Sequence, residues 1–74
     1  MEKKSLLAQK FGAHVRRLRT ERGMSQEEVA FACERSLNYM SEIETGKRNP
    51  TLDTVAAICA ALGMTLTEFF DGME

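Results

Sequence analysis

SQEEVAFACERSLNYMSEIETG, residues 25–46, contains the signals for two short helices joined by a three-residue connection. Its opening Ser25-Gln-Glu-Glu28 has the spacing of a capping box and predicts a helix from Gln26 to about Cys33. Ser36 is a favoured N-cap for a second helix, which stops at Gly46. Two helices joined so tightly predict a sharply angled helix-turn-helix over about 26–45.

The second of these helices is expected to have a buried and an exposed face. Met40 and Ile43, three residues apart, are predicted to point inward. The outer face then carries Leu37, Asn38, Tyr39 and Glu42. An exposed helix with an amide near its N-terminus fits the DNA major groove, where amide side chains pair with adenine. A helix pair alone is weak evidence for DNA binding, because many all-helical domains contain one.

Capping and periodicity signals predict three further helices around this stretch. Before it, apolar residues at three- and four-residue steps predict an amphipathic helix that ends before Gly23, at Leu7, Phe11, Val15 and Leu18. After it, Thr51 caps a helix closed by Gly63, with an apolar face of Leu52, Val55, Ile58, Cys59 and Leu62. Thr65-Leu-Thr-Glu68 is a second capping box that opens a short last helix. No segment alternates with period two, so the expected fold is all-α with five helices.

The size and composition of the chain indicate one cytoplasmic domain, residues 1–74. No apolar run approaches the roughly 20 residues that span a bilayer, so no membrane association is expected. The opening MEKKSLLAQKFGAH has no uninterrupted apolar core, which argues against secretion. Cys33 and Cys59 are far apart and form no CxxC pattern, so both are expected to be reduced thiols facing the core.

The sequence contains none of the common catalytic or metal-binding motifs. GxSxG, HExxH and phosphate-loop patterns are absent. The single histidine, His14, and the two cysteines lack the spacing of metal ligands. We therefore expect no enzyme, no catalytic residue, no metal and no cofactor.

Charge is distributed unevenly along the chain. The formal net charge is −1. Residues 1–48 hold all ten Lys and Arg beside seven acids, for a net +3, whereas residues 49–74 hold four acids and no Lys or Arg. Such a chain can present a basic face to nucleic acid whatever its total charge, although ordinary solvated helix faces explain the same pattern equally well.

Several short motifs together give the chain a family resemblance. These are Ser25-Gln26-Glu27-Glu28, Ile43-Glu44 followed by Gly46, Arg48-Asn49-Pro50, and Leu62-Gly63. From about Phe11 to Phe70 the sequence resembles the Cro and repressor proteins of phages. That family includes regulators of the xenobiotic-response-element type and the controller proteins of restriction–modification systems. The resemblance implies a five-helix, lambda-repressor-like fold, DNA binding through the second helix of the helix-turn-helix, and usually a two-fold dimer on a roughly palindromic operator.

The resemblance also implies roles for individual residues. Gln26 matches a glutamine that meets a DNA phosphate, and Arg19 and Glu44 match a structural pair between the first and third helices. Groove-facing positions are matched by Asn38, Tyr39 and Glu42. Ser41 matches a position that contacts the DNA backbone, and the phosphate-contacting loop is matched by Arg48 and Asn49. Lys47 lies in the same loop, where a solvated charge is an equal alternative.

Three residues depart from the family pattern. Glu34 occupies a turn position usually held by glycine or asparagine, so its backbone is expected to be left-handed at some cost. Arg35 replaces an apolar residue; either its stem covers the core or its charge is directed toward DNA. Leu37 occupies an often polar position, where it either contacts a thymine methyl group or reduces the number of specific hydrogen bonds.

The last helix predicts the mode of self-association. It carries more apolar surface than two turns can bury against a small core, at Leu66, Phe69, Phe70 and Met73. A homodimer through this surface is expected. The alternative function is an antitoxin or adaptor module that holds a protein partner such as a toxin or RNA polymerase, with Phe31, Phe70 and Met73 exposed for it and DNA binding secondary.

Overall fold

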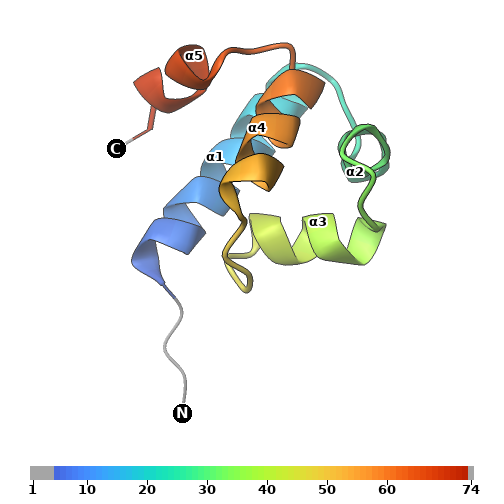
Figure 1. Ribbon diagram of the computed structural model, residues 1–74, viewed down its shortest axis with the longest axis horizontal. Helices are drawn as coiled ribbons and strands as arrows, with labels where there is room; N and C mark the ends of the chain where they lie inside the picture. Colours follow the sequence, from blue (N-terminus) through green and yellow to red (C-terminus); the bar gives the residue numbers. More distant parts are fainter. Residues whose placement is uncertain (1–4, 74) are drawn as a thin grey trace.

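The computed structural model describes residues 5–73, and five helices account for most of them (Figure 1). In chain order these are α1 (Leu6–Glu21), α2 (Gln26–Ala32), α3 (Leu37–Glu44), α4 (Leu52–Ala61) and α5 (Leu66–Asp71). No strand occurs among the described residues, so the all-α prediction is confirmed. No helix in this part of the chain is long and apolar enough to cross a membrane.

Side-chain caps start all five helices of residues 5–73, and the sequence signals predict four of them. The N-cap residues are Ser5, Ser25, Ser36, Thr51 and Thr65. Both predicted capping boxes form: the Ser25 N–H donates to Glu28 at 2.7 Å, and the Thr65 N–H donates to Glu68 at 2.9 Å. Because each cap stabilises its helix by about 1 kcal/mol, local chemistry sets these helix boundaries.

The position of α3 depends on a close backbone contact with α1. Figure 1 shows α3 and α5 at opposite ends of the view, with α1 and α4 between them. α3 packs against both α1 and α2. At Gly12 of α1, a Cβ atom would lie only 2.1 Å from the carbonyl oxygen of Ile43 in α3. The absence of a side chain at Gly12 therefore sets the depth at which α3 lies.

The core is formed by apolar side chains from all five helices. The largest fully buried ones are Val15, Val29, Met40, Ile43, Ile58 and Phe69. The predicted inward positions of α3, Met40 and Ile43, are thus confirmed. Two other predicted core positions are wrong: Leu7 is 68% exposed and Leu52 is 87% exposed. Each lies in the first turn of its helix, beyond the edge of the core. The apolar pattern of the helix therefore extends further than the core that buries it.

Phe69 corrects another prediction, because it belongs to the core of the monomer and is not available for a dimer interface. Its side chain has no exposed surface. The ring centroid lies 5.4 Å from that of Phe11 and 4.7 Å from that of His14. α5 is only six residues long, and Phe69 is the side chain that anchors it on α1.

His14 forms a second connection between α1 and α5. The imidazole is buried, as expected for a packed histidine. Nδ1 lies 2.9 Å from Arg17 Nη2 and must accept its hydrogen, because a guanidinium only donates. Nε2 therefore carries the proton of the neutral ring and donates to the carbonyl oxygen of Phe69 at 2.5 Å.

The turn between α2 and α3 requires a left-handed residue, as the sequence predicts. Glu34 has φ 57°, and every other positive φ in residues 5–73 is at a glycine. A left-handed conformation costs a non-glycine residue roughly 1–2 kcal/mol. The Arg35 N–H donates to the carbonyl oxygen of Ala30 at 2.9 Å, which closes α2 and turns the chain toward α3.

Candidate nucleic-acid interface

The outer face of α3 is predominantly polar and lies over an apolar inner face. Leu37 and Asn38 are exposed, and Tyr39, Ser41 and Glu42 are partly exposed. Met40 and Ile43, on the inner face, are fully buried. The arrangement presents the predicted groove-facing residues on one surface and fixes the helix beneath them.

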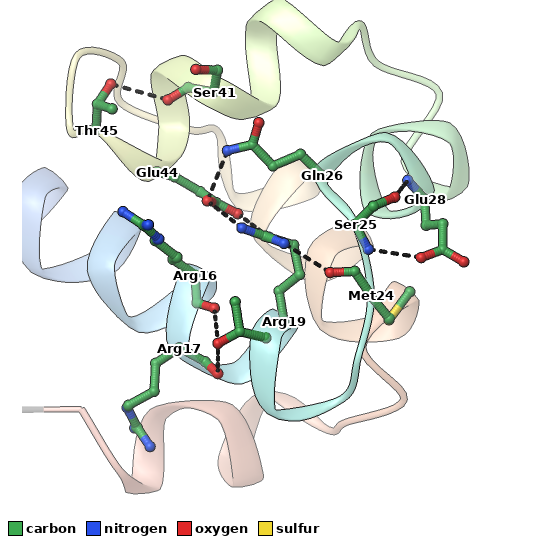
Figure 2. A network of polar contacts seen from close by, with 11 residues as sticks. Arg16, Arg17, Arg19, Met24, Ser25, Gln26, Glu28, Ser41, Glu44 and Thr45 are labelled. Carbon is green, nitrogen blue, oxygen red and sulfur yellow. Dashed lines mark hydrogen bonds and ion pairs between the residues drawn. The ribbon is translucent and has the colours of Figure 1, made fainter.

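A buried ion pair holds α3 against α1 (Figure 2). Arg19 Nε lies 2.6 Å from Glu44 Oε2, and Arg19 Nη2 donates to Glu44 Oε1 at 3.1 Å. The two side chains are only 11% and 2% exposed. The hydrogen bond from Arg19 to Glu44 raises the pKa of the guanidinium above its usual value. Arg19 also donates to the carbonyl oxygen of Met24, so the pair fixes the start of the helix-turn-helix as well.

Gln26 joins this network, a contact that the sequence does not predict. Its Nε2 donates to Glu44 Oε1 at 2.9 Å, as Figure 2 shows. A carboxamide has two N–H donors and one acceptor oxygen, so one donor and the oxygen remain for another partner. The buried carboxylate of Glu44 thereby orients the amide at the first residue of α2.

Tyr39 lies next to two arginines from different segments. The Cζ atoms of Arg35 and Arg48 are 4.9 Å and 4.8 Å from the centroid of its ring. Both distances fall within the range of cation–π attraction. Arg35 Nη2 also donates to Thr54 Oγ1 of α4 at 3.3 Å. The guanidinium of Arg35 is therefore held beside the outer face of α3, close to the predicted groove-facing residues.

Arg48 forms an exposed ion pair with Glu42. Its Nε and Nη2 donate to the same oxygen, Glu42 Oε1, at 2.9 Å and 2.6 Å. The side chains are 48% and 31% exposed. The neighbouring loop residues Lys47 and Asn49 are exposed. Arg48, which the sequence assigns to phosphate contact, is thus already paired with a residue assigned to the groove.

Two residues that the sequence reasoning did not single out belong to this region. Thr54 is buried and accepts the hydrogen bond from Arg35. Arg16 is exposed, and in Figure 2 its guanidinium extends from α1 toward the C-terminal end of α3. For Arg16 the available signal is its spacing: it precedes Arg19 by three residues, which puts the two on neighbouring parts of one helix surface.

A second, apolar surface lies at α5. Leu66 and Phe70 are 51% and 44% exposed, and Met73 is half-buried. Phe70 stacks edge-on against Phe69, with ring centroids 4.9 Å apart. Beside it is a hollow of about 200 Å³ lined mainly by Leu7, Phe11, Pro50, Val55, Phe70 and Met73. We call Leu7, Leu66, Phe70 and Met73 the α5 surface.

The cysteines have the environment of structural thiols. Cys59 is buried and Cys33 is half-buried, so the prediction that Cys33 faces the core holds only in part. Burial raises the pKa of both thiols, and the charge of Arg35 partly offsets this at Cys33. A raised thiol pKa lowers reactivity. No group of three or more potential metal ligands occurs within residues 5–73.

Comparison with known proteins gives consistent results. A helix-turn-helix domain family matches residues 10–69. The HTH-type transcriptional regulator DdrOP3 of Deinococcus deserti is 35% identical over 60 residues, which are 81% of this chain and 46% of that protein. Control protein C.BamHI of Bacillus amyloliquefaciens is 42% identical over 62 residues, 82% of this chain and 76% of the relative.

A solved structure extends this comparison to three dimensions. The restriction–modification controller protein C.AhdI of Aeromonas hydrophila superimposes with a TM-score of 0.84 at 35% identity. The superposition covers 89% of this chain and all of that one. The match therefore includes the arrangement of the helices as well as the sequence of the helix-turn-helix.

Proposed function

Because this chain belongs to the helix-turn-helix family of transcriptional regulators, we propose that it binds its operator as a homodimer, with one α3 in the major groove of each half-site. The operator is a roughly palindromic double-stranded DNA, and the protein acts in the cytoplasm without a catalytic step or a cofactor. Because the similar protein C.AhdI is a restriction–modification controller protein, control of a restriction–modification system is the first biological role to test.

The observation that carries this proposal is the two-sided character of α3. Its inner face is anchored by buried Met40 and Ile43 and by the Arg19–Glu44 pair. Its outer face offers Asn38 for hydrogen bonding and Leu37 for apolar contact with a thymine methyl group. A rigid helix with exposed polar groups is suited to contact base edges in a fixed register.

Residues around α3 supply the contacts with the DNA backbone. We assign phosphate contacts to Gln26, Ser41, Lys47 and Asn49, with Arg35 as an additional positive charge beside Tyr39 and with Arg48 kept at the same surface by its ion pair with Glu42. Phosphate contacts position a protein on the duplex, whereas base contacts specify the sequence. The free N–H of Gln26 suits such a contact because Glu44 already fixes the orientation of its amide.

The α5 surface is the proposed dimer interface. Leu66, Phe70 and Met73 provide exposed apolar area next to the hollow lined by Leu7. A two-fold dimer on DNA requires its two recognition helices to lie about 34 Å apart, one turn of the duplex. Sedimentation equilibrium tests the association: monomer alone at tens of micromolar, a concentration typical of weak dimers, contradicts it.

The test of DNA binding is selection of bound duplexes from a random-sequence pool, followed by titration of selected and scrambled sequences. A related motif repeated at one-turn spacing supports the proposal. A pool that stays random through successive rounds contradicts sequence-specific binding.

One observation favours the adaptor or antitoxin alternative. Phe31 on α2 is 86% exposed, more than any residue of the α5 surface. A single exposed phenylalanine is ordinary, so this alternative ranks second. Duplex binding by the purified protein distinguishes the two functions: sequence-specific binding supports the regulator, and the absence of any duplex binding puts the adaptor function first.

A further inference from the structure

We infer that Glu42 determines operator sequence by accepting a hydrogen bond from a cytosine amino group, with Arg48 acting as the positioning residue for its carboxylate. The inference rests on the proposed DNA-binding function and adds the identity of one recognised base. The sequence assigns Glu42 to the groove and Arg48 to the phosphates as separate contacts; the structure connects them.

The ion pair occupies only half of the Glu42 carboxylate. Both donors of Arg48 use Oε1, at 2.9 Å and 2.6 Å. Within residues 5–73, no donor bonds to Oε2. The Glu42 side chain is 31% exposed on the outer face of α3, and we assign Oε2 as the oxygen that accepts a hydrogen bond from outside the protein. Arg48 is itself restrained by its position over the ring of Tyr39, 4.8 Å from the centroid.

Arg48 makes an acidic residue compatible with a DNA-binding surface. An unpaired carboxylate next to phosphates meets repulsion between like charges. The guanidinium of Arg48, 2.6 Å from Oε1, balances that charge. The pair is therefore suited to approach the duplex intact, as a nearly neutral unit with one free acceptor.

The chemistry of the base edges selects cytosine as the partner. A carboxylate only accepts hydrogen bonds. In the major groove guanine presents the acceptors N7 and O6, and thymine presents the acceptor O4 and a methyl group. Adenine presents its amino donor beside the acceptor N7, whereas cytosine presents the N4 amino donor alone. A carboxylate oxygen therefore meets least repulsion at cytosine.

The same pairing reduces binding to other sequences. Opposite guanine or thymine, Oε2 faces acceptors and loses its solvent partners without a replacement, which carries a desolvation penalty. While Glu42 holds Arg48, this arginine also contributes less to sequence-independent attraction. Glu42 thus raises the ratio of specific to non-specific affinity in two ways: it favours one base, and it reduces the non-specific attraction due to Arg48.

Glu42→Gln is the direct test, because a carboxamide keeps the shape of the side chain but removes its charge and favours adenine. Sequences are selected from a random pool with the wild type and the variant, and the selected duplexes are then titrated. We expect one cytosine per half-site to be enriched by the wild type and to be lost, or replaced by adenine, with Glu42→Gln. Affinity for the cytosine-containing duplex is expected to fall by on the order of tenfold.

Glu21→Gln is the matched control. It removes the same charge and breaks another exposed pair, Arg17–Glu21, at 3.2 Å and about half exposed on both sides. In Figure 2 Arg17 extends away from α3, so this variant is expected to keep the wild-type base preference. Circular dichroism confirms that each variant is folded.

Salt dependence tests the positioning role of Arg48. Glu42→Gln releases Arg48 to a phosphate, so the slope of log affinity against log salt becomes steeper by about 0.9. In an Arg48→Ala background the same change leaves the slope unaltered. A steeper slope in both backgrounds shows that Glu42 does not act through Arg48.

The selection result separates this inference from the proposed function. If wild type and Glu42→Gln select the same base at every position, the cytosine assignment is wrong while DNA binding stands. If the wild type selects no sequence, the proposed function fails first and the assignment of Glu42 fails with it.

Discussion

Two arginine–glutamate pairs are made by the same helix, two residues apart, and they have opposite environments. Glu44 and Glu42 both lie 2.6 Å from a guanidinium nitrogen. The Arg19–Glu44 pair is 11% and 2% exposed, whereas the Arg48–Glu42 pair is 48% and 31% exposed. Water screens the second pair and is excluded from the first. Similar distances therefore correspond to different roles: the inner pair supports the fold, and the outer pair leaves one carboxylate oxygen without a partner among residues 5–73.

The largest expected effect is the loss of stability when the inner pair is broken. Glu44→Ala leaves Arg19 as a buried unpaired charge and removes the acceptor of Gln26. The free energy of unfolding should fall by about 3–5 kcal/mol, measured by urea denaturation. Arg19→Ala should behave similarly. A variant that keeps wild-type stability but changes base preference would contradict the structural role of this pair.

A smaller effect is expected on the outer face of α3. Asn38→Ala should weaken binding to the selected operator by about 1–3 kcal/mol and leave stability nearly unchanged, because Asn38 is exposed. Unrelated duplexes should lose little affinity, since non-specific binding depends on phosphates. Equal losses on matched and scrambled duplexes would show that Asn38 does not contact a base edge.

The turn before α3 allows a test of backbone strain at Glu34. Glu34 has φ 57°, so Glu34→Gly relieves backbone strain but also gives the unfolded chain more freedom. We expect a net stabilisation of up to about 1 kcal/mol, with operator preference preserved. A lowered melting temperature in the folded variant would indicate that the Glu34 side chain stabilises the turn by more than the strain it causes.

Loss of the exposed Arg48–Glu42 pair is expected to change stability least. Glu42→Gln should change the free energy of unfolding by less than about 0.5 kcal/mol, because exposed pairs contribute little. The same denaturation experiment as for Glu44→Ala gives this value. A loss of several kcal/mol would show that the outer pair is a structural element like the inner one.

Local signals predict most of the fold. Four of the five N-caps and both capping boxes follow from single residues and their spacing, and the left-handed Glu34 follows from the family resemblance. The errors arise where periodicity continues beyond the core. Leu7 and Leu52 fit the apolar pattern but lie in first turns and are exposed. Phe69 is the opposite error: the sequence groups it with Leu66, Phe70 and Met73 as surface, but its side chain is buried.

The candidate site is less predictable than the fold. The sequence identifies the outer face of α3, but not the contacts that orient its side chains. Arg48 bonds to Glu42 across the end of a helix, and Arg35 bonds to Thr54 across nineteen residues. Neither distance corresponds to a helical repeat, so each contact depends on how the chain is folded. The Arg19–Glu44 pair is predicted by family resemblance and not by spacing.

The close approach of α1 and α3 at Gly12 limits which positions can change as such a protein evolves new DNA targets. Any side chain at this position would collide with the backbone of α3, so this position is closed to change for as long as the helix keeps its depth. Positions 37, 38 and 42 lie on the opposite face of α3 and contribute little to the core. Under the proposed mode of binding, substitutions there alter which operator is bound without changing how α3 packs. New regulatory targets are thus within reach of one or two mutations, each compatible with a folded protein at every step.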